Sequence, residues 1–176
     1  RQAAPNLTGG KEITAKQLLE QAKGTIQDKM KSQSLLQAEL LRGLGMAQSN
    51  MSDYAQADLT LGEALKQFQS LGQTDLAAEV QIERAEAAFA MGDRPRAQTL
   101  VESAVSAHQL QRLAPSTQVG YHQLVGLLEY GRANPQRAKA EFQRAYELAQ
   151  KHLGDTDPKT TLELVLLARA ESQMHD

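Results

Sequence analysis

The chain has 176 residues and a formal net charge of −2 at pH 7, which argues against a nucleic-acid or anionic-membrane surface as its main role. It contains no cysteine, which excludes disulfides, thiolate metal sites and cysteine nucleophiles. Hydrophobic residues make up 41% and aromatic residues 4%, so the core must consist of leucine, alanine and valine, and no apolar run approaches the roughly 18 residues of a membrane span.

The first residues differ in character from the rest. Residues 1–12 carry Pro5, Gly9 and Gly10 without hydrophobic periodicity, so we expect a flexible lead-in or linker there. Residues 13–176 are expected to form one helical repeat domain. Because the chain begins at Arg1 and not at a methionine, we expect it to be a piece of a longer protein.

Apolar residues recur at helical spacing from residue 14 to residue 174, and no stretch alternates as a strand would. Thr14 with Gln17 and Asp53 with Gln56 fit capping boxes, while Gly72 and Gly92 are typical helix stops. Proline at 95, 115, 135 and 158 suits the first turn of a helix. These signals predict eight helices, at about 14–31, 34–50, 53–71, 74–91, 93–113, 115–131, 135–151 and 159–174.

A pattern of a small, a large and a small residue at positions i, i+4 and i+7 occurs four times along the chain. Its first alanines, Ala15, Ala57, Ala97 and Ala138, are spaced 42, 40 and 41 residues apart. The central large residues are Leu19, Leu61, Val101 and Phe142. Self-similarity at a fixed period of this size is the mark of a helical repeat array, in which stacked helix pairs bury their apolar sides.

These units resemble tetratricopeptide repeats. In the first full unit Leu44-Gly45 matches the family's Leu-Gly pair, and Tyr54, Ala57 and Ala64 match its second helix. The resemblance implies an all-α, right-handed α-solenoid of about three full repeats with a half repeat at each end. The period here exceeds the family's usual value of about 34 residues, and in this it is similar to the lengthened repeats of kinesin light chains and many bacterial proteins.

A narrower resemblance concerns the start of the chain. Residues 9–26, GGKEITAKQLLEQAKGTI, followed by the first repeat, look like the region after the membrane helix in bacterial serine/threonine kinases with C-terminal repeats. This implies the non-catalytic part of a bacterial signalling protein, extracytoplasmic if it is attached to a membrane kinase and cytoplasmic otherwise.

The tetratricopeptide resemblance also implies a groove, because in that family the first helix of each unit lines the concave face. Among the implied positions Phe89, Leu127 and Tyr130 lie off the main apolar stripe, and such an apolar strip would suit a peptide. The competing interpretation is that longer second helices cover them. The predicted partner-binding residues are Arg42, Met46, Asn50, Ile82, Glu86, Phe89, Gln123, Leu127, Tyr130 and Arg169, with Val165 beside them.

The sequence shows no catalytic or ligand-binding motif that would make it an enzyme. The four histidines lack metal-type spacing, and neither H-E-x-x-H nor G-x-S-x-G occurs. We therefore expect no cofactor, no metal and no membrane insertion by this chain, and a protein or peptide as partner. Two alternatives stay open: an oligomerisation element that self-associates through the apolar 162–168 run, LELVLLA, or a repeat domain that senses a small ligand.

Overall fold

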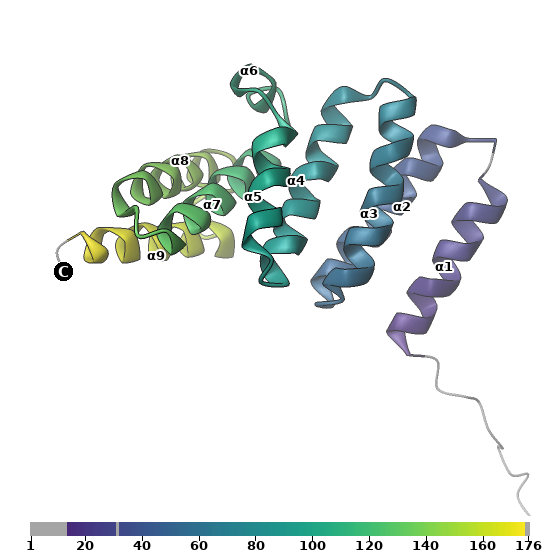
Figure 1. The fold of residues 1–176 in the computed structure, drawn as a ribbon, viewed down its shortest axis with the longest axis horizontal. Coiled ribbons are helices and arrows are strands. Elements are labelled where there is room, and N and C mark those ends of the chain that lie inside the picture. Colours follow the sequence, from purple (N-terminus) through teal and green to yellow (C-terminus); the bar gives the residue numbers. More distant parts are fainter. Residues whose placement is uncertain (1–13, 31, 175–176) are drawn as a thin grey trace, which may run out of the picture.

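The computed structural model describes residues 14–30 and 32–174, so the predicted lead-in at residues 1–12 lies outside the described residues. Within them the chain folds into helices and no strand occurs. Figure 1 shows the helices following one another along the long axis of the molecule. The helices are α1 (Ala15–Lys29), α2 (Ser34–Asn50), α3 (Tyr54–Ser70), α4 (Thr74–Ala90), α5 (Arg94–Ala104), α6 (Ala107–Leu110), α7 (Pro115–Gly131), α8 (Pro135–Leu153) and α9 (Pro158–Gln173).

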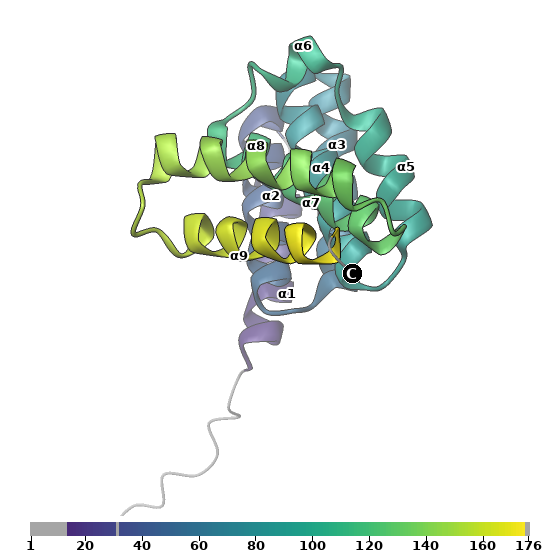
Figure 2. The same ribbon diagram turned by 90° about the vertical axis from the view of Figure 1, so that its left-hand side faces the viewer.

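The helices pack in sequence-adjacent pairs, α2 with α3, α4 with α5 and α7 with α8, which confirms the predicted all-α solenoid. Helices α1 and α9 are the half repeats at the two ends. The direction of the helices turns along the array, since α8 and α9 run across the direction of α1 (Figures 1 and 2).

The turns between helices largely follow the predicted chemistry. Thr14 and Gln17 form the expected capping box, and Gly72 and Gly92 have φ values of 68° and 83°, which glycine adopts without strain. The predicted capping box at Asp53 is wrong, because its side chain makes no cap hydrogen bond. Its carboxylate instead pairs with Lys16 Nζ at 2.9 Å and so ties α1 to the start of α3.

One contact occurs in the first and third full units, and the second unit has small and large residues at the matching positions. A small residue of the first helix faces the large central residue of the second: Gly45 faces Leu61, and Gly126 faces Phe142. A methyl carbon placed on Gly45 would lie 2.6 Å from Leu61 Cγ, and one on Gly126 would lie 2.6 Å from Phe142 Cδ1. The middle unit has Ala85 and Val101 in one buried cluster at the same positions. Where the first helix carries alanine in place of glycine, the second helix carries valine in place of the bulkier leucine or phenylalanine.

The predicted helix at 93–113 is wrong at its centre. Helix α5 ends at Ala104, Val105 is extended with φ −146° and ψ 149°, and the Ser106 hydroxyl caps the short α6. By leaving the helix, the chain buries Leu110 and Leu113 against α4. We call residues 105–114 the α5–α7 linker. Burial of two leucines outweighs the local preference for a continuous helix.

Burial is weakest where the array starts. Leu36 and Leu40 of α2 are 40% and 38% exposed, while Ala38 and Leu41 are fully buried. Helix α1 contributes no buried residue. Within the described residues no helix precedes α1, and part of the apolar stripe stays open.

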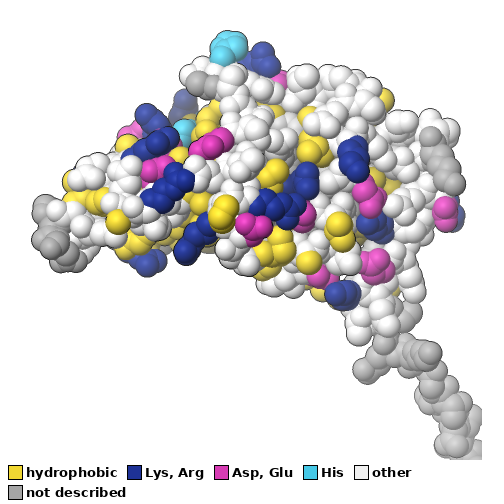
Figure 3. All heavy atoms as spheres, viewed as in Figure 1, with side chains coloured by type: hydrophobic (Ala, Val, Ile, Leu, Met, Phe, Trp, Pro, Cys, Tyr) yellow, Lys and Arg dark blue, Asp and Glu magenta, His cyan; other side chains and the backbone are white. Residues whose placement is uncertain are grey.

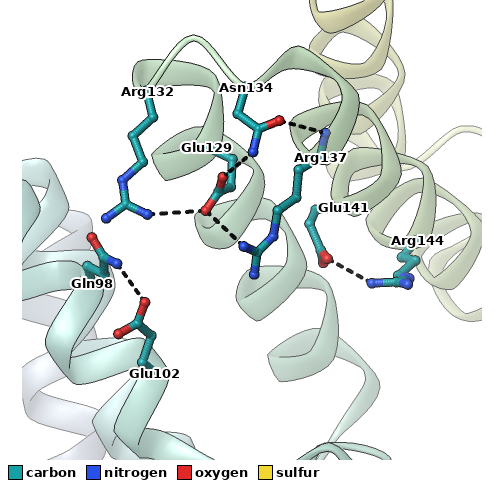
Figure 4. Close-up of polar contacts among 8 residues, drawn as sticks. All are labelled: Gln98, Glu102, Glu129, Arg132, Asn134, Arg137, Glu141 and Arg144. Atoms are coloured by element: carbon teal, nitrogen blue, oxygen red, sulfur yellow. Dashed lines mark hydrogen bonds and ion pairs between the residues drawn. The ribbon is translucent and has the colours of Figure 1, made fainter.

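A buried carboxylate organises the turn between α7 and α8. Glu129 is 5% exposed and accepts hydrogen bonds from Arg132 Nη1 at 3.2 Å and Asn134 Nδ2 at 2.9 Å (Figure 4). Arg137 Nη1 lies 3.6 Å from the same carboxylate, and Asn134 also caps α8. Since both oxygens of the Glu129 carboxylate have partners within the turn, we assign it a structural role.

The repeated contact predicts opposite effects for two glycine substitutions. Gly126→Ala should lower the free energy of unfolding by about 1–3 kcal/mol, because the added methyl meets the Phe142 ring, which is 1% exposed and cannot yield. Gly43→Ala has nothing within 4 Å of the added carbon and should stabilise by up to about 1 kcal/mol through helix propensity. Urea unfolding followed by circular dichroism measures both. Equal stability of the two variants would contradict the close approach of α7 and α8.

Candidate functional site

A hollow of about 470 Å³ opens between the first helices of the repeats. Its walls come from α2, α4, α7 and α9, with Tyr54 at the start of α3. We call it the groove. Its wall is largely apolar, with Phe89, Leu124, Leu127 and Leu162 among the contributors. A hollow with apolar walls and a few polar groups is the usual form of a binding site.

The structure brings eight of the ten predicted groove residues to this hollow. They come from three successive first helices, as the repeat pattern implied, and are Arg42, Met46, Asn50, Ile82, Glu86, Phe89, Gln123 and Leu127. Tyr130 and Arg169 lie outside it. The Arg169 guanidinium carbon stands 5.7 Å from the centre of the Tyr130 ring, and Tyr130 packs on the core between α8 and α9. Val165 is also absent from the wall and is 51% exposed.

Ile82 lines the groove but is not exposed there. It was predicted as an exposed inner residue, but it is fully buried in a cluster with Ala78, Leu110 and Leu113. The α5–α7 linker therefore covers the part of α4 that Ile82 would otherwise present to a partner. Phe89 and Leu127 stay half-buried, and each also packs against a core cluster. Ile82 is thus covered by the linker and not by a second helix. The competing interpretation, that second helices cover Phe89, Leu127 and Tyr130, holds in part, since all three are half-buried against clusters that include second-helix residues.

Sequence reasoning missed the contribution of α9. The prediction placed Val165 and Arg169 on the groove, whereas Lys159, Leu162 and Glu163 line it. A glutamate within the most apolar run of the chain was the available signal. The other wall residues not predicted are Ser49, Tyr54, Glu83, Ala87, Ala90, Ser116, Thr117, Val119, Gly120 and Leu124.

An arginine bridge joins α2 to α4 at one end of the groove. Arg42 Nη1 lies 2.6 Å from Glu79 Oε2, and Nη2 and Nε lie 2.6 and 2.9 Å from Glu83 Oε1. Burial alone would lower the pKa of Arg42, but hydrogen bonds and charges from Glu83 and Glu79 raise it overall. Glu79 Oε1 also accepts a hydrogen bond from the backbone of Ala114, at the end of the α5–α7 linker. Arg42 is therefore already neutralised within the protein.

Two carboxylates of α4 face the groove. Glu83 Oε2 is buried without a hydrogen-bond partner in the described structure, although its other oxygen binds Arg42. The pKa of Glu83 is raised by burial, against the opposing effect of Arg42. Glu86 lies against Gly120 of α7, where any side chain would collide with its carboxylate. Burial and the charge of Glu83 raise the pKa of Glu86, but its side chain is open to water, so screening limits this shift.

Glu163 is the most secluded acid of the groove. It is 1% exposed, and its Oε2 has no hydrogen-bond partner among the described residues. Burial raises its pKa to about 7, and the nearby charge of Lys159 only partly opposes this. An unpaired carboxylate at this depth costs stability, so its presence calls for an explanation other than packing.

Throughout residues 14–30 and 32–174, no group of three or more His, Asp or Glu side chains is placed to hold a metal ion. In that same part of the chain no helix combines the length and apolarity needed to cross a membrane. On the face in Figure 3, basic and acidic side chains lie side by side and form no extended patch of one sign.

Comparisons with known proteins define the fold alone. No family model matches this chain, and no curated protein matches it. Among solved structures, it is similar to the crystal structure of BtubC (BKLC) from P. vanneervenii, with a TM-score of 0.70 and 20% sequence identity. The match covers 92% of this chain and 66% of that protein, so the chain spans somewhat less than two thirds of the length of BtubC. By its fold, this chain is therefore a member of the helical repeat class.

The burial of Glu163 predicts a pH-dependent stability. Its folded-state pKa of about 7 lies above the ordinary value of 4.5, so its stabilising contribution is complete below about pH 4.5 and is lost as the pH rises through 7. Glu163→Gln removes this loss and should exceed the wild type in free energy of unfolding by on the order of 2 kcal/mol at pH 8, with little difference near pH 4.5.

Urea unfolding across this pH range measures the effect. Glu39→Gln, on the exposed side of α2, is the matched control and should follow the wild type at every pH. A Glu163→Gln variant that is less stable than the wild type at pH 8 would show that the ionised carboxylate has a stabilising partner.

Proposed function

We propose that this chain is a protein-interaction module of tetratricopeptide type that binds a peptide segment of a partner protein in the groove. The observation that supports the proposal most is an open, largely apolar hollow whose wall draws on four first-type helices. Exposed apolar residues at its edge, Met46 at 45% and Leu162 at 46%, can be buried by a partner. Binding of a small ligand at the same hollow is the alternative function.

The edge residues supply a direct test with matched controls. Peptides selected from a random displayed library on the immobilised protein are measured by fluorescence anisotropy. Met46→Ser and Leu162→Ser should weaken binding about tenfold or more, because each removes most of one buried apolar side chain. Leu59→Ser and Leu164→Ser change residues that are 59% and 49% exposed and lie outside the groove, so they should leave affinity unchanged. Equal losses in all four variants, or no peptide selected, would contradict the proposal.

Self-association through α9 is a second candidate, favoured by a specific observation. Leu164 and Val165 are 49% and 51% exposed on the last helix, which has no following repeat in this structure. Exposed apolar side chains at the end of a solenoid favour contact with a second copy. Sedimentation velocity should then show a dimer that Leu164→Ser with Val165→Ser converts to a monomer. A wild-type monomer at high concentration would rule this out.

We also propose that the module belongs to a larger bacterial signalling protein, in the manner of repeat-bearing serine/threonine kinases. Support comes from the lead-in at residues 9–26 followed by the first repeat. Sequencing the gene upstream of the codon for Arg1 tests this. A membrane helix preceded by a kinase domain is the expected result, and an unrelated upstream domain would contradict it.

A further inference from the structure

The groove carries more negative than positive charge, and its least accessible acid is unpaired. Four carboxylates, Glu79, Glu83, Glu86 and Glu163, face or support the groove, against the two cations Arg42 and Lys159. Arg42 is engaged by Glu79 and Glu83. No ion pair joins Lys159 to another described residue, although its charge acts on both Glu86 and Glu163.

The carboxylates are directed at the same space from two elements. Glu83 and Glu86 come from α4 and Glu163 comes from α9, and all three line the groove. The charge of Lys159, also on α9, acts on both Glu86 and Glu163. Glu163 is 1% exposed yet lines the hollow, and one oxygen of Glu163 and one of Glu83 are buried without hydrogen-bond donors in the described structure. Each such oxygen is an acceptor that lacks the donor a buried acceptor normally has.

We propose that the groove recognises a peptide segment whose lysine or arginine side chain enters between Glu86 and Glu163, with apolar residues on either side. The cationic head supplies the missing donors, and its aliphatic stem lies along the wall that includes Phe89, Leu127 and Leu162. A basic side chain complements the negative charge of the carboxylates on α4 and α9, and its apolar neighbours in the peptide complement the apolar residues of the groove wall. This inference rests on the proposed peptide-binding function and specifies its partner.

The proposal predicts a proton-linked affinity. A ligand cation favours the ionised form of Glu163, whose pKa is about 7, so affinity for a basic peptide should rise between pH 6 and pH 8. Burial also raises the pKa values of Glu83 and Glu86 on α4, so their ionisation adds to the rise, and Arg42 and Lys159 are the cations that face these acids. Glu163→Gln should flatten this dependence.

The test compares peptide selection by two proteins. Random dodecapeptides displayed on phage are selected at pH 8 on the wild type and on the Glu86→Gln, Glu163→Gln double variant, both substitutions being isosteric. The wild type should select peptides enriched in lysine or arginine beside apolar residues, and the double variant should lose that enrichment. Individual basic peptides should bind the double variant about ten- to hundredfold more weakly, as expected for lost hydrogen bonds between charged groups.

Each other outcome has a distinct meaning. Selected peptides without basic enrichment, or with equal enrichment on both proteins, overturn this inference and leave the peptide-binding function intact. Failure to select any peptide overturns both. Spermidine is titrated alone by calorimetry, and if it binds the wild type as tightly as the selected peptides do, the site recognises a free amine and the peptide assignment is wrong. Glu39→Gln, outside the groove, should select as the wild type does.

Discussion

Each full repeat depends on one contact, in which a small residue of the first helix admits the large central residue of the second. Gly45 admits Leu61 and Gly126 admits Phe142, and Ala85 shares a buried cluster with Val101 at the matching positions, at spacings of 40 and 41 residues. The bulkier alanine is paired with the smaller valine, and glycine is paired with leucine or phenylalanine. All three large residues are at most 2% exposed. Because backbones can approach only where side chains are small, these positions determine which face of each first helix is buried within its pair.

The opposite face of the first helices is then left to form the groove. Buried ion pairs connect neighbouring repeats there and beside it: Arg42 reaches Glu83 from α2 to α4, and Asp58 of α3 binds Arg84 at 2.9 Å and Arg96 at 2.6 Å. These partners satisfy most of the charge between repeats. In the groove, by contrast, buried Glu163 has an oxygen without a hydrogen-bond partner in the described structure, and Glu86 is open to water. The groove thus differs from the α7–α8 turn, where the buried carboxylate of Glu129 is paired.

The sequence was sufficient for features that arise from local chemistry or from the repeat period. It predicted the helix pairs and the glycine stops. Eight of its ten chosen positions line the hollow on α2, α4 and α7, because the period carries a position from one repeat to the next. It failed where a distant contact decides the outcome. Leu110 and Leu113 break the helix to reach α4, and Ile82 is buried as a result. On α9, the position taken over from the earlier repeats was wrong, because no second helix follows α9 in the described structure to set which of its faces is buried. Glu163 lines the groove, and Arg169 does not.

A double-mutant cycle on the first repeat tests the central contact most directly. Gly45→Ala with Leu61→Val copies the Ala85–Val101 pair of the middle repeat into the position of the first. Each single change should lower the free energy of unfolding, Gly45→Ala by overpacking and Leu61→Val by leaving a cavity. The loss in the double variant, measured by urea unfolding, should be smaller than the sum of the two single losses by about 1–2 kcal/mol. Additive losses would show that the two side chains do not share one volume, and the account of the repeat contact would be wrong.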